Sequence, residues 1–531
     1  HCFREPARAT QTLTEFIHGP AADRATPRTR ELAWDLVPRL LALCPDPTSE
    51  SRRKSAHRTT AAARAGRLAA PVLSDPDRVL ARLATFTTSY GARTLLFKAW
   101  SHHPKVFELL LWLFDRSEFL AELAIRNPDL VEDLEEGNRL RQTKTTAEIL
   151  TDLRHGLNDA DQRDWLRRYF QTEFMRIGLR GILSLADFEE HLTELSALAG
   201  ACLQYSLEVV LRQHRLRSAP LAIISFGKLG GAELTYGSAL ELAFVTDDKA
   251  RDLPALSQLA AAVLDLLSAN TDFGQVFPTQ VRLRPTHDLL VHSLAAYERY
   301  FLQHAPLPEI LELSRARVIA GDAEIGREFV QSSHELCDFR PDAERVARPV
   351  QGLGATPDTV RIAGRVALDT GLQALPRSRP ACFTANWRSE LATLRRSLVS
   401  PAPSAAHEVL AFKTGAGGLL DAELIARTFC LARGWHEPGT LRALERARQA
   451  GALPAKDLDA LLASFRQLRR VEGILCRWSH AAEPRLPEDA AAQRRVALRC
   501  GFTTAAALLK ALAGWRAEVR RVFDNVLPTA G

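Results

Sequence analysis

Residues 220–248 read PLAIISFGKLGGAELTYGSALELAFVTDD, and this stretch decides the fold. After a proline, LAIISF is a short apolar run with two β-branched isoleucines that stops at Gly227, which predicts a buried strand. A glycine-rich turn follows, and LELAFV at 240–245 predicts a second strand. FPTQVRLRP at 277–285 predicts a third, after a helix at 256–270. These elements predict a small α+β unit.

Helical segments flank this unit on both sides. Apolar residues recur at three- and four-residue intervals in TRELAWDLVPRLLALC (29–44) and LSALAGACLQYSLEVVLRQH (195–214), and again in LDALLASFRQLRRVEGILCRW (458–478). The chain is therefore predicted to be mainly α, with helical domains on both sides of the α+β unit. The predicted domains are an N-terminal helical region at 1–215, the α+β unit at 216–340, a connecting region at 341–405 and a C-terminal helical bundle at 406–531.

The composition is that of a globular protein rather than of a disordered or membrane-spanning one. Of 531 residues, 46% are hydrophobic and 25% charged, and the formal charge of +6 is spread along the chain, which gives no argument for nucleic acid. No apolar run approaches the roughly 20 residues that span a bilayer. The eight cysteines form no CxxC pair, so we expect reduced thiols in a cytoplasmic protein. The chain begins at His1, which leaves open whether a segment precedes it.

The glycine-rich turn is a candidate phosphate site. Glycines after a strand let backbone amides approach a phosphate closely, and Lys228 could add a point charge beside Gly227. Gly237 and Ser238 come just before the second strand and complete the candidate nucleotide-binding set. Glycine-rich turns also occur as plain turns, so the turn alone does not decide between the two readings.

The order of motifs gives a more specific indication. The turn resembles the signature of the glutamine synthetase adenylyltransferase family, which runs GKLGG, then EL, then Gly-Ser, then Asp-x-Asp-Leu. The matching residues are Gly227, Lys228, Leu229, Gly230, Gly231, Glu233, Leu234, Gly237, Ser238 and Leu242. Three further landmarks follow in the family's order: RLRP (282–285) with LVHSLAAYERY (290–300), RARVIAGD (315–322), and FKTGAGGLLDAEL (412–424), which supplies Gly417, Gly418, Asp421 and Glu423.

The resemblance implies a fold and an activity. Members of the family contain a nucleotidyltransferase palm like that of DNA polymerase beta and transfer AMP from ATP to a tyrosine of glutamine synthetase, or remove it. The resemblance implies ATP and Mg²⁺ as cofactors, with glutamine synthetase and a PII-type signalling protein as partners. Family members usually carry two such modules in tandem. This chain shows one signature and so resembles a single module.

The chain departs from the family where the family holds its metal. The resemblance places three aspartates at positions occupied here by Ala239, Glu241 and Gln280. Mg²⁺ needs hard oxygen ligands in near-octahedral geometry, and only Glu241 keeps a carboxylate. Glu241 is therefore the one candidate catalytic residue, and Glu241 with Gln280 would form a degenerate metal site. We predict a catalytically impaired homologue. Two alternatives stay open: an active adenylyltransferase with a rebuilt metal site, and a helical protein-interaction scaffold.

Nearby side chains carry weaker predictions. Asp247, Asp248 and Asp272 could substitute as ligands but fit solvated loops better. Arg282 and Arg284 alternate on a predicted strand, so both could face a triphosphate, or they could instead pair with acids such as Asp421 and Glu423. The remaining motif residues are predicted to be structural, and they are Gly230, Gly231, Glu233, Gly417, Gly418, Asp421 and Glu423.

Overall fold

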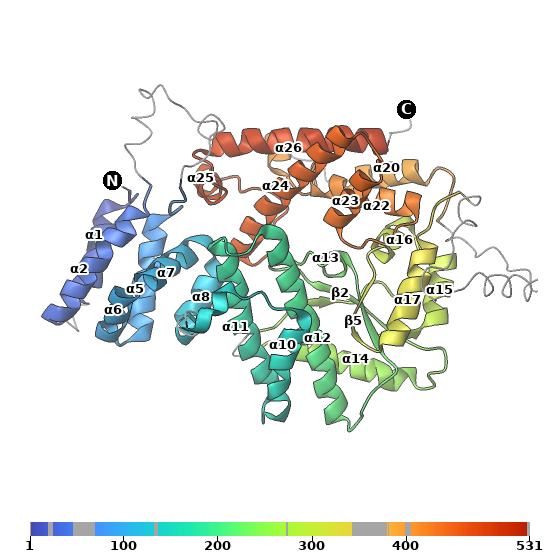
Figure 1. The fold of residues 1–531 in the computed structure, drawn as a ribbon, viewed down its shortest axis with the longest axis horizontal. Coiled ribbons are helices and arrows are strands. Elements are labelled where there is room, and N and C mark those ends of the chain that lie inside the picture. Colours follow the sequence, from blue (N-terminus) through green and yellow to red (C-terminus); the bar gives the residue numbers. More distant parts are fainter. Residues whose placement is uncertain are drawn as a thin grey trace, which may run out of the picture.

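The structure of this chain is a computed structural model, and it describes residues 2–19, 25–45, 70–131, 136–271, 274–341, 380, 382–398 and 405–527. Figure 1 shows the first helices gathered at one end of an elongated molecule, with the sheet toward the other end. The last helix, α26 (Ala505–Val526), runs along one long side, next to α24 (Ala455–Ser479). The order of layers is therefore helices, sheet and helices, as the sequence predicts.

Five short strands form the central sheet, in the order β3-β2-β1-β5, with β4 also paired to β2. Their bounds are β1 Ala222–Ser225, β2 Leu240–Thr246, β3 Thr279–Gln280, β4 Val291–Ser293 and β5 Arg317–Gly321. β1 is antiparallel to β2 and β5, whereas β3 and β4 lie parallel to β2. The first two strands confirm the sequence prediction.

Both faces of the sheet are covered, and each face belongs to a different core. Successive side chains of a strand point to opposite faces. Ile223 of β1 and Phe244 of β2 pack into a core shared with the N-terminal helices. Ile224 and Val245 pack into a second core shared with the C-terminal helices. Because no face of these strands meets water, their sequences are continuous apolar runs rather than alternating ones.

The N-terminal helices begin at recognisable caps. The side chain of Thr26 accepts a hydrogen bond from the backbone N–H of Thr29 at the start of α2, and Asp187 does the same for Glu190 at the start of α12. The helices before the sheet are α1 Pro6–His18, α2 Pro27–Ala42, α5 Pro76–Tyr90, α6 Arg93–His102, α7 Pro104–Arg116, α8 Glu118–Arg126, α10 Thr146–Arg154, α11 Gln162–Ile182 and α12 Phe188–Gln213.

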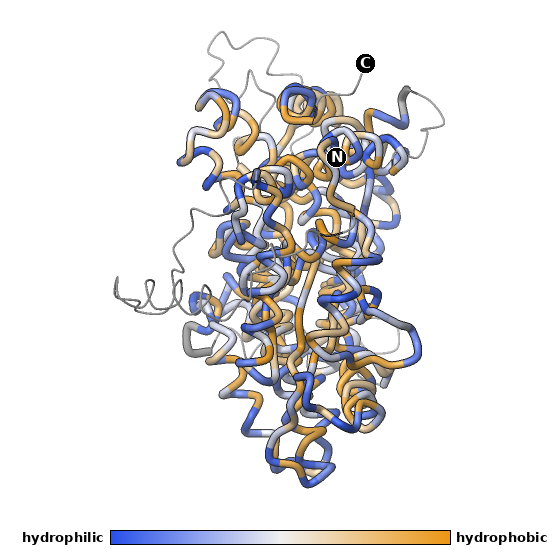
Figure 2. The backbone as a smooth tube through the Cα atoms, turned by 90° about the vertical axis from the view of Figure 1, so that its right-hand side faces the viewer, coloured by the Kyte–Doolittle hydropathy of each residue, from blue (hydrophilic) through white to orange (hydrophobic). Residues whose placement is uncertain are grey.

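Helices also connect the strands and follow them. Within the α+β unit these are the single turn α13 Gly227–Gly230, then α14 Leu253–Ser268, α15 Leu294–Gln303, α16 Leu307–Leu313 and α17 Ala323–Leu336. The helices after it are α20 Trp387–Leu398, α21 Ala405–Leu410, α22 Leu419–Arg433, α23 Thr440–Gln449, α24, α25 Ala490–Arg499 and α26. Along many of them the tube of Figure 2 changes between apolar and polar residues, as amphipathic packing requires.

The structure departs from the sequence prediction in the third strand and beyond it. β3 contains only Thr279 and Gln280, so Arg282 and Arg284 lie past its end. β4 and β5 were not predicted. Most of the predicted connecting region 341–405 lies outside the described residues. None of the described helices is long and apolar enough to cross a bilayer.

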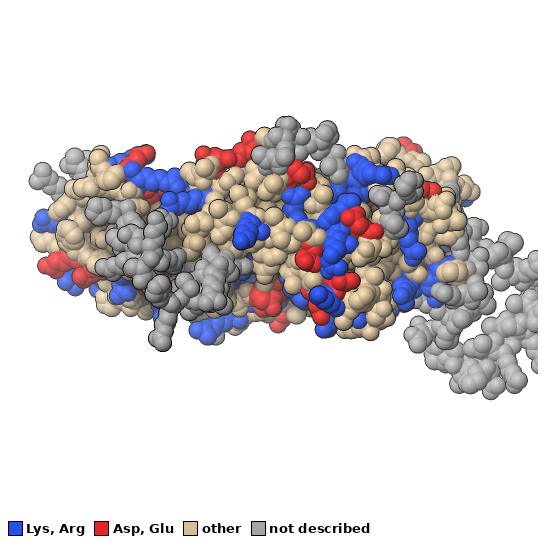
Figure 3. All heavy atoms as spheres, turned by 90° about the horizontal axis from the view of Figure 1, so that it is seen from above, with Lys and Arg blue, Asp and Glu red and all other residues tan. Residues whose placement is uncertain are grey.

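Charges of both signs are mixed on the face that carries α26. Figure 3 shows Lys and Arg interspersed with Asp and Glu over that face, without a field of one sign. This distribution agrees with a formal charge of only +6.

Candidate functional site

The turn that joins β1 to β2 forms the centre of the candidate site. The chain leaves β1, makes the single helical turn α13 and returns through Gly237 to β2. Gly227 has a φ of +54°, and a Cβ on it would lie 2.8 Å from the carboxyl carbon of Glu241. The absence of a side chain at Gly227 therefore lets the Glu241 carboxylate pack against the turn.

Glu241 and Gln280 lie side by side. They are register partners on the parallel strands β2 and β3, which run about 4.8 Å apart, so their side chains share one face of the sheet. The structure therefore brings together the two polar positions that the sequence places at the metal. Ala239 offers no ligand, so this pair supplies one carboxylate and one amide oxygen.

Other acids near this pair do not complete a metal site. The Glu312 carboxyl of α16 has its pKa raised by burial, and the charges of Glu241 and Glu423 raise it further against the opposing effect of Arg315. Glu423 is engaged by Arg469 at 3.0 Å. Across the described part of the chain, no group of three Asp, Glu, His or Cys side chains is arranged to hold a metal ion.

The loop aspartates lie elsewhere. Asp247 accepts a hydrogen bond from the backbone N–H of Lys249, and Asp248 accepts one from Ala295, both beyond the opposite end of β2 from Glu241. Asp272 lies outside the described residues. The residues present thus do not fit the Mg²⁺ that the family resemblance implies, because hard-cation sites need several anionic oxygens.

Lys228 is bound within the protein. Its Nζ donates to Glu472 of α24 at 2.9 Å and to Thr235 at 2.8 Å. Glu472 also accepts from Arg469 at 2.6 Å, and Lys413 lies 3.5 Å away. The ammonium that the sequence offers to a phosphate is therefore paired with a fully buried carboxylate.

Glu233 forms the second half of the same network. One carboxylate oxygen accepts from Arg315 at 3.0 Å and from Arg469 at 3.1 Å. The other accepts from the backbone N–H groups of Thr440 and Leu441 at the start of α23. Glu233 thus links the turn to the C-terminal helices.

The glycines of the motif lie where no side chain fits. A Cβ on Gly230 would clash with the carbonyl of Arg315, and one on Gly231 would clash with the Arg315 guanidinium. Gly237 has a φ of +67°, and a Cβ there would lie 2.5 Å from the carbonyl oxygen of His480. Ser238 shares a hydrogen bond with Thr235 at 2.8 Å. The end of α24 therefore covers the Gly237-Ser238 side of the turn.

The arginines of the RLRP motif are not held by the acids suggested for them. Arg282 is exposed, and Arg284 donates to His287 at 3.2 Å. Asp421 pairs with Arg395 and accepts from the backbone N–H of Gly417.

Asp421, Gly417 and Gly418 fix the start of α22. Gly418 caps this helix, and Gly417, at a φ of +71°, packs against the backbone of Arg516. The motif at 417–423 is therefore a packing element around the start of α22.

Two residues of the site were missed from the sequence, although a signal was present. Arg469 and Glu472 fall on the apolar stripe of α24, between Phe465, Leu468 and Leu475. Charged residues at stripe positions are buried with the stripe and need partners. Such an interruption of helical periodicity indicates a buried ion network.

Comparisons with known proteins agree with the motif order. Residues 107–332 match the family model described as glutamate-ammonia ligase adenylyltransferase. Residues 406–527 match a model described as GlnD PII-uridylyltransferase. Over the first of these regions the chain matches the glutamine synthetase adenylyltransferase family. The first match covers the turn, the sheet and its flanking helices, so the predicted family is confirmed for the region that carries the candidate site.

Curated relatives in this family are longer than the chain. Proteins named bifunctional glutamine synthetase adenylyltransferase/adenylyl-removing enzyme from Aromatoleum aromaticum and Thioalkalivibrio sulfidiphilus are 27% and 26% identical to it over 75% and 88% of its length. A relative of the same name from Neisseria meningitidis serogroup B is 31% identical over 52% of the chain. The chain spans 40%, 45% and 32% of these relatives, less than half of each.

Proposed function

We propose that this chain acts in the control of glutamine synthetase by AMP, as a catalytically impaired member of its family. The names of its relatives support the regulatory role. One observation supports the impairment: the register pair at the metal position contributes a single carboxylate, from Glu241, beside the amide of Gln280. Without two further anionic ligands, a divalent cation cannot be held where it would align the ATP α-phosphate with a tyrosine hydroxyl.

We propose glutamine synthetase and a PII-type protein as the partners. The match of residues 406–527 to a PII-uridylyltransferase model supports the second of these. ATP with Mg²⁺ is the cofactor set of the family, and its retention here is the point that the experiment below decides.

The test is transfer of α-phosphate-labelled ATP to glutamine synthetase by the purified chain, with Mg²⁺ or Mn²⁺. The matched variant restores the family's three carboxylates through Ala239→Asp, Glu241→Asp and Gln280→Asp together. We expect no label above background from the natural chain and measurable transfer from the restored variant. The intact Neisseria relative serves as the positive control. Transfer by the natural chain that disappears in Glu241→Gln would instead establish an active enzyme with a rebuilt site.

A second candidate function is a protein-interaction scaffold without nucleotide. The specific observation in its favour is that Lys228 is paired with Glu472 and that Gly237 packs against His480, so α24 occupies the approach to the turn. Equilibrium dialysis with ATP, with and without Mg²⁺, separates the two readings. Binding of ATP favours the impaired homologue, and its absence favours the scaffold.

A further inference from the structure

A cavity of about 780 Å³ lies between the N-terminal helices and α24, separate from the metal position. Its walls come from α7, the ends of α11 and α12 that face each other, α24 and the end of α25. We call it the arginine cavity, because Arg116, Arg470, Arg477 and Arg499 line it. Its size is within the roughly 300–1,000 Å³ of small-molecule sites.

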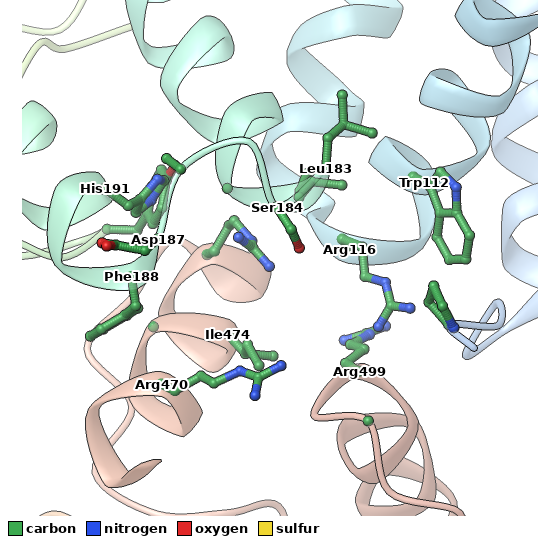
Figure 4. Close-up of a pocket in the computed structure, with 18 of the residues that line it drawn as sticks. Trp112, Arg116, Leu183, Ser184, Asp187, Phe188, His191, Arg470, Ile474 and Arg499 are labelled. Carbon is green, nitrogen blue, oxygen red and sulfur yellow. The ribbon is translucent and has the colours of Figure 1, made fainter. Parts of the chain in front are cut away.

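The arginines approach this space from different elements. In Figure 4, the guanidinium groups of Arg116 and Arg499 lie close together on one side, and Arg470 extends toward them from α24. The hydroxyl of Ser184 points into the same space from the loop after α11. Four cations from three parts of the chain thus converge on one cavity.

Negative charge within the protein does not balance these cations. Asp187 is the only acid among the described residues that line the cavity, and its carboxylate already caps α12. Asp115 pairs with Arg116 at 3.1 Å but does not itself line the cavity. In the part of the chain that the structure describes, no carboxylate makes an ion pair with Arg470 or Arg477.

Several buried donors also lack partners. The Nε of Arg477, the Nη2 of Arg499 and the hydroxyl of Tyr236 are buried without a hydrogen-bond partner among the described residues. Arg499 is otherwise fixed, because its Nε donates to Ser74 at 2.9 Å and its guanidinium stacks on Trp478 at 3.4 Å. Unpartnered buried donors are rare in native proteins and indicate a missing acceptor.

The pKa values of the same groups reflect this electrostatic cost. Burial, together with the neighbouring charges of Arg116 and Arg470, lowers the pKa of Arg477 to about 10. Burial likewise lowers the pKa of Arg499 to about 10, although Asp115 favours its charge, and Arg116 lowers the pKa as well. Both groups stay charged at neutral pH. Charges held together at such a cost need an anion to compensate them.

We propose that the arginine cavity binds a phosphorylated small molecule, with its phosphate held by Arg116, Arg477 and Arg499. A guanidinium presents its N–H groups as a planar fork that matches the oxygens of a phosphate. Three such forks on one anion would satisfy the free donors of Arg477 and Arg499. Arg470, exposed at the rim, would contact a second phosphate or steer the ligand inward.

This site is independent of the proposed function. Arg469 and Glu472 lie on the face of α24 that meets the turn, whereas Arg470, Gly473 and Arg477 line the cavity from another face. A ligand there would touch both helical regions of the chain at once. The two sites meet only at Thr235 and Tyr236, which line the cavity next to Gly237.

The experiment is isothermal titration calorimetry of the full chain with inorganic pyrophosphate, inorganic phosphate and citrate. The variants are Arg477→Gln and Arg470→Gln, and the matched control is Arg168→Gln, an exposed arginine of α11 outside the cavity. We expect pyrophosphate and phosphate to bind, with affinity falling as salt rises. Arg477→Gln should weaken binding about tenfold or more, Arg470→Gln severalfold, and Arg168→Gln not at all.

Four outcomes would overturn the proposal. They are the absence of phosphate and pyrophosphate binding, binding that neither cavity variant weakens, tighter binding of citrate than of pyrophosphate, and a lower melting temperature of ligand-free Arg477→Gln. The last readout separates the proposal from a structural role. Arg477 is partly buried and has no carboxylate partner among the described residues, so removing its charge should leave the ligand-free chain as stable as before or more stable, whereas removing an arginine with a structural role should lower the melting temperature.

Discussion

Replacing Glu472 by glutamine should destabilise the chain more than any comparable surface change. The side chain of Glu472 is fully buried, and it faces Lys228 at 2.9 Å, Arg469 at 2.6 Å and Lys413 at 3.5 Å. Burial by itself would raise the pKa of Glu472, but these three cations outweigh burial and hold that pKa well below its ordinary value of 4.5. The carboxylate is therefore ionised at neutral pH, and glutamine would keep its shape but remove its charge.

The expected loss can be worked out from the contacts that remain. Removing one partner of a buried ion pair costs about 3–5 kcal/mol of folding free energy. Lys228 would keep Thr235 as an acceptor, and Arg469 would keep Glu233 and Glu423. Because both cations keep a hydrogen-bond or ion-pair partner, we expect a loss of folding free energy at the lower end of this range, about 3 kcal/mol.

Urea unfolding followed by circular dichroism measures this loss as a shift of the transition midpoint. The matched control is Glu445→Gln, which removes the carboxylate of an ion pair with Arg466 at 2.6 Å, where both side chains are about 40% exposed. Exposed pairs contribute about 0–1 kcal/mol, so the control should shift little. If Glu472→Gln loses no more stability than Glu445→Gln, the buried network does not stabilise the chain and the argument is wrong.

Three further predictions concern pH, a backbone position and a thiol. The pKa of Glu472 is lowered in the folded chain, so the stabilisation by its charge is present above pH 4.5 and is lost as the pH falls below that value. The difference in urea midpoint between the natural chain and Glu472→Gln should therefore become smaller between pH 7 and pH 4. Gly237→Ala should lower the melting temperature, since the left-handed backbone alone costs about 1–2 kcal/mol and the methyl group meets the carbonyl of His480, whereas Gly514→Ala, in the open interior of α26, should raise it. Burial raises the pKa of the Cys202 thiol, so mass spectrometry should find it unalkylated by iodoacetamide at pH 8 in the native chain and alkylated in urea.

The strands that the sequence predicts well are those whose local pattern is complete. LAIISF and LELAFV are short apolar runs between turn residues, and both became strands because each of their faces meets a core. β5 was missed because it begins with Arg317, a charged residue that is unusual in a β-strand. Its guanidinium donates to the carbonyl of Gly230 at 3.0 Å, so the charge ties the strand to the turn.

The candidate site could be predicted in position but not in its partners. The family resemblance assigns Glu241 and Gln280 to the positions of two metal-binding aspartates, and these two residues are register partners in the sheet. The partner of Lys228 could not be inferred from spacing, because Glu472 lies 244 positions further along the chain. Contacts of that separation depend on how the turn after β1 packs against the C-terminal helices, which local sequence patterns do not encode.

The two-sided sheet has a consequence for how this chain can change over generations. Ile223 and Ile224 are neighbours in one strand, yet they serve different cores, the first among the helices before the sheet and the second among those after it. Recombination can replace one helical region by that of a relative. The imported helices must then pack against every second side chain of a strand that did not come with them. Divergence in the two regions is therefore coupled through the side chains of β1 and β2, and exchange of either region alone should be rare.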